Sequence, residues 1–273
     1  MAARAERIGA DKTRLEFWRL LTLAILAGAF IGFGSMLANI AGVGAAGVLP
    51  YGLTRLIVGL VFSLGLILVV VGGAELFTGN NLMVMAWAGG KVGAREVLRA
   101  WLIVYAGNFI GAGATAAFVF LAGHYDDAGG AVGAAALAAA RDKVELAFFP
   151  ALVRGILANV LVCLAVWLCY SARSTTDRIL AIVPPIAAFV AAGFEHSVAN
   201  MYLLPFALLI KAGAPASFWT AIGSSPEVHA GLTWTAVAAN LLPVTIGNII
   251  GGALLVGAVY WFVYLYGRAT ASG

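Results

Sequence analysis

Six apolar runs, each long enough to cross a lipid bilayer, make up most of this chain. The sequence of 273 residues is 63% hydrophobic and 10% charged, with a mean hydropathy of +1.00. Soluble domains are about 45–50% apolar and about 25% charged. A straight helical span needs about 20 apolar residues, and the runs cover 18–46, 54–88, 97–123, 145–171, 178–211 and 234–267. The sequence therefore predicts an all-α polytopic membrane protein with six transmembrane helices.

The second and fifth runs are each interrupted by an octapeptide of the same pattern. Residues 73–80 read Gly-Ala-Glu-Leu-Phe-Thr-Gly-Asn and residues 193–200 read Gly-Phe-Glu-His-Ser-Val-Ala-Asn, so both follow Gly, any residue, Glu, four residues, Asn. Ionisable side chains at membrane depth are costly and mark functional sites by default. Unwound backbone at that depth must be buried in protein or line a wet cavity. We therefore expect helices two and five to be broken, with half-helix N-termini that favour a small anion.

A second pair of matched motifs lies in the third and sixth runs. Residues 107–111 read Gly-Asn-Phe-Ile-Gly and residues 247–251 read Gly-Asn-Ile-Ile-Gly. Their asparagines, Asn108 and Asn248, are expected to form hydrogen bonds between packed helices. Three spans followed by three matched spans predict an inverted 3+3 repeat, because an odd number of crossings brings the second half in from the opposite side.

This repeat divides the single transmembrane domain, residues 1–273, into four parts. They are an N-terminal cytoplasmic segment (1–17), a first repeat (18–122), an extracytoplasmic connector (123–144) and a second repeat (145–267). The stretch 4–20 is predicted to be an amphipathic surface helix. The stretch 126–140, rich in glycine and alanine, is predicted to be an exposed loop.

The distribution of lysine and arginine predicts the orientation. Of the 16 basic residues, five fall on one side of the predicted spans, namely Arg55, Arg141, Lys143, Arg154 and Lys211. The remaining ones fall on the side that holds both ends of the chain. By the positive-inside rule both termini are cytoplasmic, and the predicted location is the plasma (inner) membrane.

An enzymatic function is not expected. The sequence shows no Walker motif, no haem motif and no Ser/His/Asp constellation, and its three histidines suggest no metal cluster. Cys163 and Cys169 lie six residues apart in one apolar run, which indicates neither a disulfide nor a metal site. We expect no cofactor, no metal and no nucleic-acid partner. A purely structural membrane protein would not need matched polar breaks at membrane depth.

With these motifs the chain resembles the formate/nitrite transporter family over about residues 15–267. The resemblance is carried by residues 73–80, by Phe-Glu-His-Ser-Val-Ala-Asn-Met at 194–201, and by Asn-Leu-Leu-Pro-Val-Thr-Ile-Gly-Asn-Ile-Ile-Gly-Gly at 240–252. Residues 218–224 are most similar to the formate channels, whereas Glu75 and Gly79 are also similar to nitrite-type members. The resemblance implies an aquaporin-like fold and a homopentamer in which each protomer has its own pore.

The resemblance also implies a set of pore residues. It places His196 and Thr78 at the centre, Asn159 and Asn200 beside the histidine, and Lys143 at the extracytoplasmic entrance. It places Phe189 in the cytoplasmic constriction near Leu76. The implied constriction residues together are Phe62, Leu66, Leu76, Phe77 and Phe189.

Glu195 stands next to His196 and is included in the candidate site because it could tune the imidazole. Neighbours along a helix do not face each other. A structural role for Glu75 and Glu195, in which the carboxylates hold the unwound segments, is favoured because their matched placement in the two octapeptides suits a scaffold.

The implied substrate is a small monovalent anion, formate foremost, with nitrite, hydrosulfide or a short carboxylate such as lactate as alternatives. An isolated carboxylate is strongly disfavoured in an apolar medium and tends to become neutral instead. Protons are therefore expected partners in transport. His196 could protonate the anion directly, or the proton could come from bulk water while His196 only polarises the anion. The sequence leaves both mechanisms open.

Overall fold

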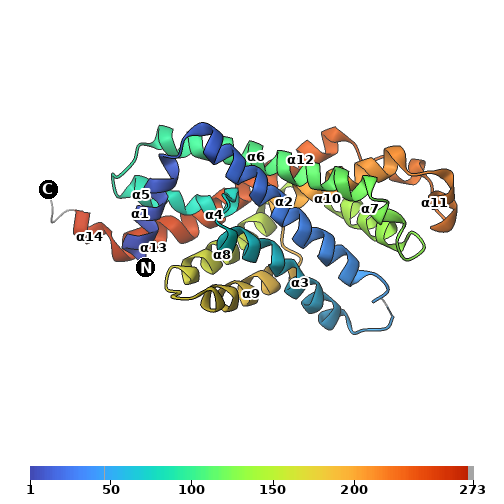
Figure 1. Ribbon diagram of the computed structural model, residues 1–273, viewed down its shortest axis with the longest axis horizontal. Helices are drawn as coiled ribbons and strands as arrows, with labels where there is room; N and C mark the ends of the chain where they lie inside the picture. The colour runs from blue at the N-terminus through green and yellow to red at the C-terminus, as the bar shows by residue number, and fades with distance from the viewer. Residues whose placement is uncertain (46, 270–273) are drawn as a thin grey trace.

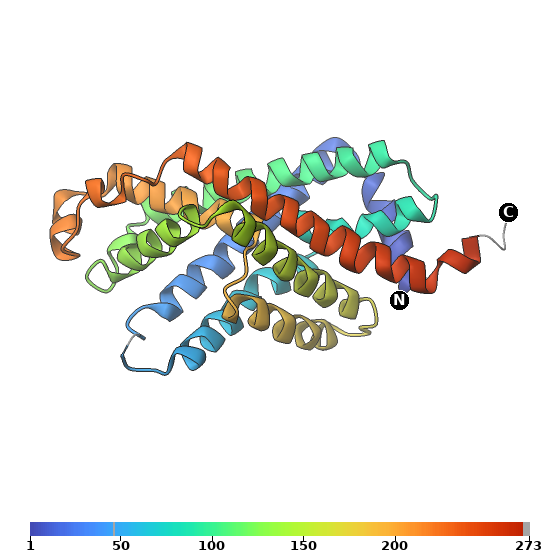
Figure 2. The ribbon, with the colours of Figure 1, turned by 180° about the vertical axis from the view of Figure 1, so that it is seen from behind.

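The computed structural model describes residues 1–45 and 47–269, and it contains helices but no strand within these residues (Figure 1). Five segments of this described part are long and apolar enough to cross a membrane. Four are the helices α2 (Phe17–Gly42), α3 (Tyr51–Gly72), α6 (Ala94–Leu121) and α8 (Phe148–Cys169). The fifth contains α12 (Trp234–Ile249), the π-helix η4 (Ile250–Ala258) and α13 (Val259–Tyr264). The first helix, α1 (Ala2–Thr13), and the last, α14 (Tyr266–Ala269), lie at the same end of the molecule (Figures 1 and 2).

Two further paths through the molecule are made of broken helices. After α3, residues 73–76 are not helical, and the chain continues in α4 (Phe77–Asn80), η1 (Asn81–Met83) and α5 (Val84–Ala88). After α9 (Thr175–Ala191), a second break precedes α10 (Ser197–Gly213). Both breaks fall within the octapeptides. Each begins at a glycine in the left-handed region, Gly73 with φ of 79° and Gly193 with φ of 72°, a conformation that ends helices.

The helices that follow the breaks run in opposite directions from the middle of the molecule. α4, η1 and α5 lead towards the end that holds α1, whereas α10 leads towards the end that holds α11 (Ala216–Ala221) (Figures 1 and 2). Both half-helix N-termini therefore start near the centre, which is the arrangement expected of an inverted repeat. The number of crossings and the aquaporin-like fold stay predictions that this arrangement supports.

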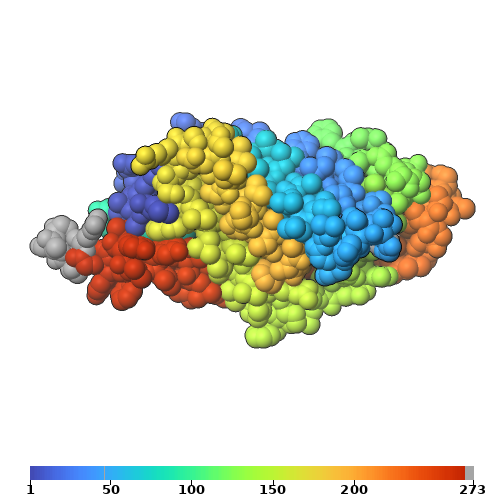
Figure 3. All heavy atoms as spheres, turned by 90° about the horizontal axis from the view of Figure 1, so that it is seen from below, coloured from blue at the N-terminus to red at the C-terminus, as the bar shows by residue number. Residues whose placement is uncertain are grey.

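The long helices pack in matched pairs. α2 contacts α6 and α3, while α8 contacts α12 and α9. α3 also contacts α9, and the two lie side by side in the space-filling view of Figure 3. Close approach requires small residues: a side chain at Gly107 would meet Ala24 of α2, and one at Gly247 would overlap the carbonyl oxygen of Leu152 of α8.

The predicted loop at 126–140 is wrong. After the short η2 (His124–Asp126), residues Ala131–Val144 form the helix α7, which buries Val132, Ala136, Leu137 and Ala140. Alanine is the best helix former, and its small side chain lets α7 pack against α10 and α12. Beyond α11, the short η3 (Pro226–His229) leads into α12.

Candidate functional site

Two cavities flank the breaks, and each is named here after its lysine. The Lys12 cavity, of about 230 Å³, is lined among others by Arg4, Lys12, Leu66, Val69, Glu75, Leu76 and Asn80. The Lys143 cavity, of about 390 Å³, is lined among others by Arg55, Phe62, Lys143, Phe189, Glu195, His196 and Asn200. α1, which carries Lys12, and α7, which carries Lys143, lie at opposite ends of the molecule (Figure 1). The two cavities therefore approach the breaks from opposite ends.

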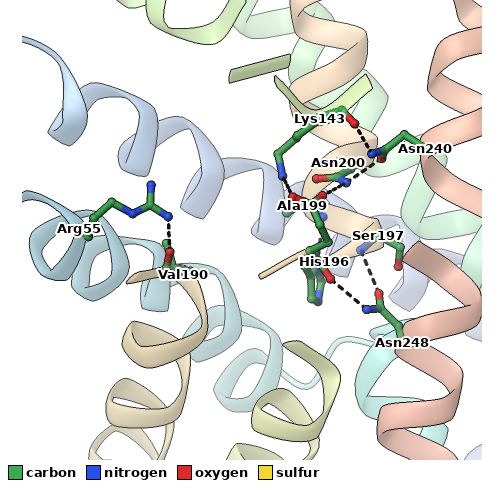
Figure 4. A network of polar contacts seen from close by, with 10 residues as sticks. Arg55, Lys143, Val190, His196, Ser197, Ala199, Asn200, Asn240 and Asn248 are labelled. Atoms are coloured by element: carbon green, nitrogen blue, oxygen red, sulfur yellow. Dashed lines mark hydrogen bonds and ion pairs between the residues drawn. The ribbon is translucent and has the colours of Figure 1, made fainter. Parts of the chain in front are cut away.

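In the Lys143 cavity, Lys143, Glu195 and Asn200 form a hydrogen-bonded triad, of which Figure 4 labels the lysine and the asparagine. Lys143 Nζ lies 2.8 Å from Glu195 Oε1, and Asn200 Nδ2 donates to Glu195 Oε2 at 2.7 Å. Asn240 of α12 accepts from Asn200 at 2.8 Å and donates to the backbone oxygen of Lys143 at 2.8 Å. The carboxylate of Glu195 is thus buried with its charge compensated, which a buried charge requires. Glu195, Lys143 and Asn200 are brought together as one group.

The Lys12 cavity repeats this triad with residues of the first half. Lys12 Nζ lies 2.9 Å from Glu75 Oε2 and 3.0 Å from Asn80 Oδ1, and Asn80 Nδ2 donates to Glu75 Oε2 at 2.8 Å. The N-terminal segment is therefore part of the site, and Lys12, Asn80 and Asn240 are site residues that the sequence reasoning missed.

A sequence signal for Lys12 does exist. Residues 11–17 read Asp-Lys-Thr-Arg-Leu-Glu-Phe and residues 142–148 read Asp-Lys-Val-Glu-Leu-Ala-Phe, so both follow Asp-Lys, two residues, Leu, any residue, Phe. Each lysine lies near the C-terminal end of a helix, α1 or α7, and a long apolar helix follows. This match supports a repeat whose first half includes α1 and whose second half includes α7, instead of the predicted halves that begin at residues 18 and 145.

Two asparagines hold the unwound backbone of the breaks. Asn108 Nδ2 donates to the backbone oxygens of Ala24 and Glu75, and its Oδ1 accepts from Phe77 N at 2.9 Å. Asn248 makes the matching bonds: its Nδ2 donates to the backbone oxygens of Gly155 and Glu195, and its Oδ1 accepts from Ser197 N. Each amide thus satisfies backbone groups that would be costly to leave unpaired in a membrane interior.

His196 and Thr78 meet between the two cavities. His196 is the N-cap of α10 and is only 3% exposed, and its Nε2 lies 3.0 Å from Oγ1 of the fully buried Thr78. Its Nδ1 accepts a hydrogen bond from Ala199 N at 3.1 Å. A neutral imidazole that accepts at one nitrogen carries its proton on the other, so Nε2–H donates to Thr78. This contact does not use the hydroxyl hydrogen of Thr78.

Asn159 lies behind this pair and lines neither cavity. Its amide donates to the backbone oxygen of Thr78 at 3.2 Å, to Asn81 Oδ1 at 2.9 Å and to the oxygen of Asn248 at 2.6 Å. It therefore positions the segment that carries Thr78, and its place beside the histidine ring stays a prediction.

The apolar residues divide between the two cavities. Leu66 and Leu76 line the Lys12 cavity, whereas Phe62 and Phe189 line the Lys143 cavity. The prediction that Phe189 lies on the Leu76 side is wrong. The Phe189 ring packs edge-on against Phe62, with centroids 5.6 Å apart, and lies 5.9 Å from the ring of His196.

Phe77 lines neither cavity. It packs against Trp101 and Tyr105 of α6, with ring centroids 6.2 Å and 4.9 Å away. The octapeptide alone gives no sign of the direction in which this ring points.

Within the described residues, no group of three or more His, Cys, Asp and Glu side chains could hold a metal ion. Membrane-length helices, two opposed broken helices and a buried imidazole–hydroxyl pair between two cavities that each contain a lysine are typical of a transport protein rather than an enzyme.

Comparisons with known proteins define the family more closely. The model of the formate/nitrite transporter family matches residues 1–262. The chain is 46% identical over 266 residues to the formate channel FocA of Escherichia coli strain K12, which covers 97% of this chain and 93% of that protein. It is 43% identical over 209 residues to FocA of Haemophilus influenzae, which covers 76% of this chain and 74% of that protein.

A solved structure described as a pentameric formate channel with formate bound is similar as well. It matches with a TM-score of 0.87 and 42% identity, over 91% of this chain and 98% of the other. The chain belongs to the formate/nitrite transporter family. The predictions of family, all-helical membrane fold and non-enzymatic function are confirmed.

Proposed function

We propose that this protein is a membrane channel for small monovalent anions, formate foremost, in which a proton assists passage. The names of the similar proteins support formate as the substrate. The observation that carries the proposal is the contact of His196 with Thr78, 3.0 Å long, in a buried position between two cavities with matched lysine triads.

The Lys143 cavity is the proposed entrance. Cations at a recess in an apolar surface raise the local concentration of anions. From there the anion passes the rings of Phe62 and Phe189, which exclude its hydration shell, and reaches the hydroxyl of Thr78. Desolvation favours the neutral acid over the anion, so the carboxylate takes up a proton and travels as formic acid. The proton is released when the acid is hydrated again on the far side.

The hydrogen bonds of His196 favour a supporting role for the imidazole. Ala199 N points at Nδ1, so the ring has one proton, on Nε2, and donates it to Thr78. Giving up this proton would leave an anionic ring in an apolar setting, which is strongly disfavoured. We therefore favour bulk water as the source of the proton, with His196 polarising the threonine hydroxyl that binds the anion.

Three further features belong to the proposal. The chain forms a homopentamer, in line with the similar solved structure, which is described as pentameric. It lies in the plasma (inner) membrane, in contact with the lipid bilayer. Both termini are cytoplasmic, so that the Lys12 cavity faces the cytoplasm.

Uptake of radiolabelled formate into proteoliposomes tests the function. Wild-type protein should carry formate faster as the external pH falls, because the supply of protons and of neutral acid rises. His196→Ala should lose most of this flux, whereas His124→Ala, a histidine outside both cavities, should keep it. Wild-type protein that carries no formate would exclude the proposal. A pH-sensitive dye inside the vesicles then measures whether protons enter with formate.

Competition separates formate from the alternatives. Nitrite, hydrosulfide, acetate and lactate are each added in excess during formate uptake. An anion that shares the path lowers formate flux, and direct flux of that anion then ranks it. Stronger transport of nitrite than of formate would reassign the protein to the nitrite-type members.

A further inference from the structure

Arg55 makes a contact in the Lys143 cavity that the proposed transport path does not use. It stands in the second turn of α3, and its guanidinium reaches across to the end of α9 (Figure 4). Nη2 donates to the oxygen of Val190 at 2.5 Å and Nε donates to the oxygen of Ala191 at 3.2 Å. These are the last residues of α9, whose terminal carbonyls have no partner within the helix. A cation at a helix C-terminus is stabilised by the helix dipole.

The two bonds join α3 and α9 at the level of the aromatic pair. Phe62 lies seven residues after Arg55, two turns further on the same face of α3, and Phe189 directly precedes Val190. The backbones of α3 and α9 are in close contact at Gly59, where a side chain would meet the carbonyl oxygen of Ala187. Arg55 and Gly59 therefore fix how far apart α3 and α9 lie where Phe62 and Phe189 meet edge-on.

The same bonds hold the start of the break that leads to His196. Gly193, with φ of 72°, comes two residues after Ala191, and a side chain there would lie 3.5 Å from Nη2 of Arg55. Within the described residues, no carboxylate lies within ion-pair distance of Arg55. The backbone carbonyls are thus the partners that the structure gives to its guanidinium.

We propose that Arg55 is a positioning residue that clamps α9 to α3 and so sets the width of the Phe62–Phe189 pair in front of His196. This inference rests on the proposed function for its effect on anion selection. Among the described residues, these two bonds are the side-chain hydrogen bonds that join α9 to α3. Without the clamp, larger anions and reagents reach His196 more readily. A lysine cannot replace the arginine fully, because a single ammonium group lacks the planar fork that reaches both oxygens.

The first test does not depend on transport. Diethyl pyrocarbonate, which reacts with accessible imidazole, is applied to purified protein, and the modified His196 peptide is quantified by mass spectrometry. Arg55→Met should raise the rate of modification about tenfold, the order expected when a charge-assisted hydrogen bond no longer holds a segment closed. Arg55→Lys should give a smaller rise, and it also carries the test if the methionine variant does not fold.

The second test is the ratio of acetate flux to formate flux in proteoliposomes. The clamp predicts that this ratio rises in Arg55→Met and rises less in Arg55→Lys. Arg141→Met is the matched control, because it removes an exposed positive charge of α7 that lines neither cavity. It should leave both the ratio and the labelling of His196 as in the wild type.

The outcomes separate the clamp from the transport proposal. If wild-type protein carries no formate, the proposed function fails, while the labelling of His196 still decides on the clamp. If Arg55→Met labels His196 at the wild-type rate, or if Arg141→Met raises labelling equally, Arg55 does not clamp the pair. A loss of formate flux in Arg55→Met with unchanged labelling of His196 would also overturn the clamp, because the positive charge of Arg55, and not its hold on α9, would then explain the loss of flux.

Discussion

The two breaks share one scaffold but differ at the residues to which the proposed function assigns contact with the substrate. Both are held by a Lys–Glu–Asn triad and by an asparagine that bonds the unwound backbone. The octapeptides align Leu76 with His196 and Thr78 with Val198. The polar pair at the centre is therefore built from one residue of each half, and each has an apolar counterpart in the other half.

This difference shows how a repeated scaffold can carry an unrepeated site. The matched residues solve the same problem twice, that of keeping a carboxylate and open backbone stable in a membrane interior. The proposed transport mechanism assigns its chemistry to the unmatched residues. Substitutions that make one half resemble the other should therefore affect transport more than they affect folding.

The largest effect is expected for His196→Leu, which copies Leu76 into the second break. It removes the donor to Thr78 and leaves the buried threonine oxygen without this partner, which costs about 1–3 kcal/mol and corresponds to a loss of formate flux of roughly fivefold to 100-fold. Flux per folded protein in proteoliposomes measures it. Unchanged flux would show that the histidine is a packing residue.

A smaller loss is expected for Thr78→Val, which copies Val198 into the first break. The variant keeps the shape of the side chain and removes the hydroxyl, so we expect a loss on the order of tenfold in formate flux. Thr78→Ser should retain most of the flux. Thr220→Val, at an exposed hydroxyl of α11, is the control; a similar loss in that variant would contradict a special role for Thr78.

A change of selectivity is expected for Phe189→Val, which copies Val69, its counterpart in the first half. Removing the ring opens the Lys143 side of the path, and the ratio of acetate to formate flux should rise on the order of threefold, because an apolar pocket discriminates weakly by size. The reverse change, Val69→Phe, should not raise this ratio. An unchanged ratio in Phe189→Val would place the selective step elsewhere.

The smallest effect concerns the two lysines. Lys143→Gln should destabilise the protein more than Lys12→Gln, because the Lys143 side chain is 22% exposed and that of Lys12 is 30% exposed, while both leave a buried glutamate unpaired. We expect a difference of about 1 kcal/mol or less. Thermal unfolding in detergent measures it. Adding Glu195→Gln to Lys143→Gln should restore part of the lost stability. If the stability does not recover, the broken ion pair is not the cause of the destabilisation.

The sequence predicts the scaffold well because the residues that form it, polar side chains in apolar runs, are recognisable by type. A glutamate in an apolar run, such as Glu75 or Glu195, must be buried with polar partners. The same spacing from each glutamate to Asn80 or Asn200 indicates the same local structure in both halves. The direction in which an apolar side chain packs cannot be predicted in the same way. Phe77 and Phe189 could each face a cavity or a neighbouring helix at a similar cost in free energy. Only the contacts with Tyr105 and Phe62 decide. Lys12 was missed because a lysine in a polar segment near the N-terminus looks like any solvated charge.

The amides of Asn108 and Asn248 have one more consequence. Each takes up two carbonyls and one N–H of the breaks and adjoining helices, so these backbone groups need no ordered water. A chain of water molecules beside the path would conduct bare protons and dissipate the electrochemical gradient across the membrane. By satisfying these backbone groups, the two side chains leave such a chain fewer groups to bind along the breaks. In the proposed channel this helps the pore to stay insulating when no substrate is present.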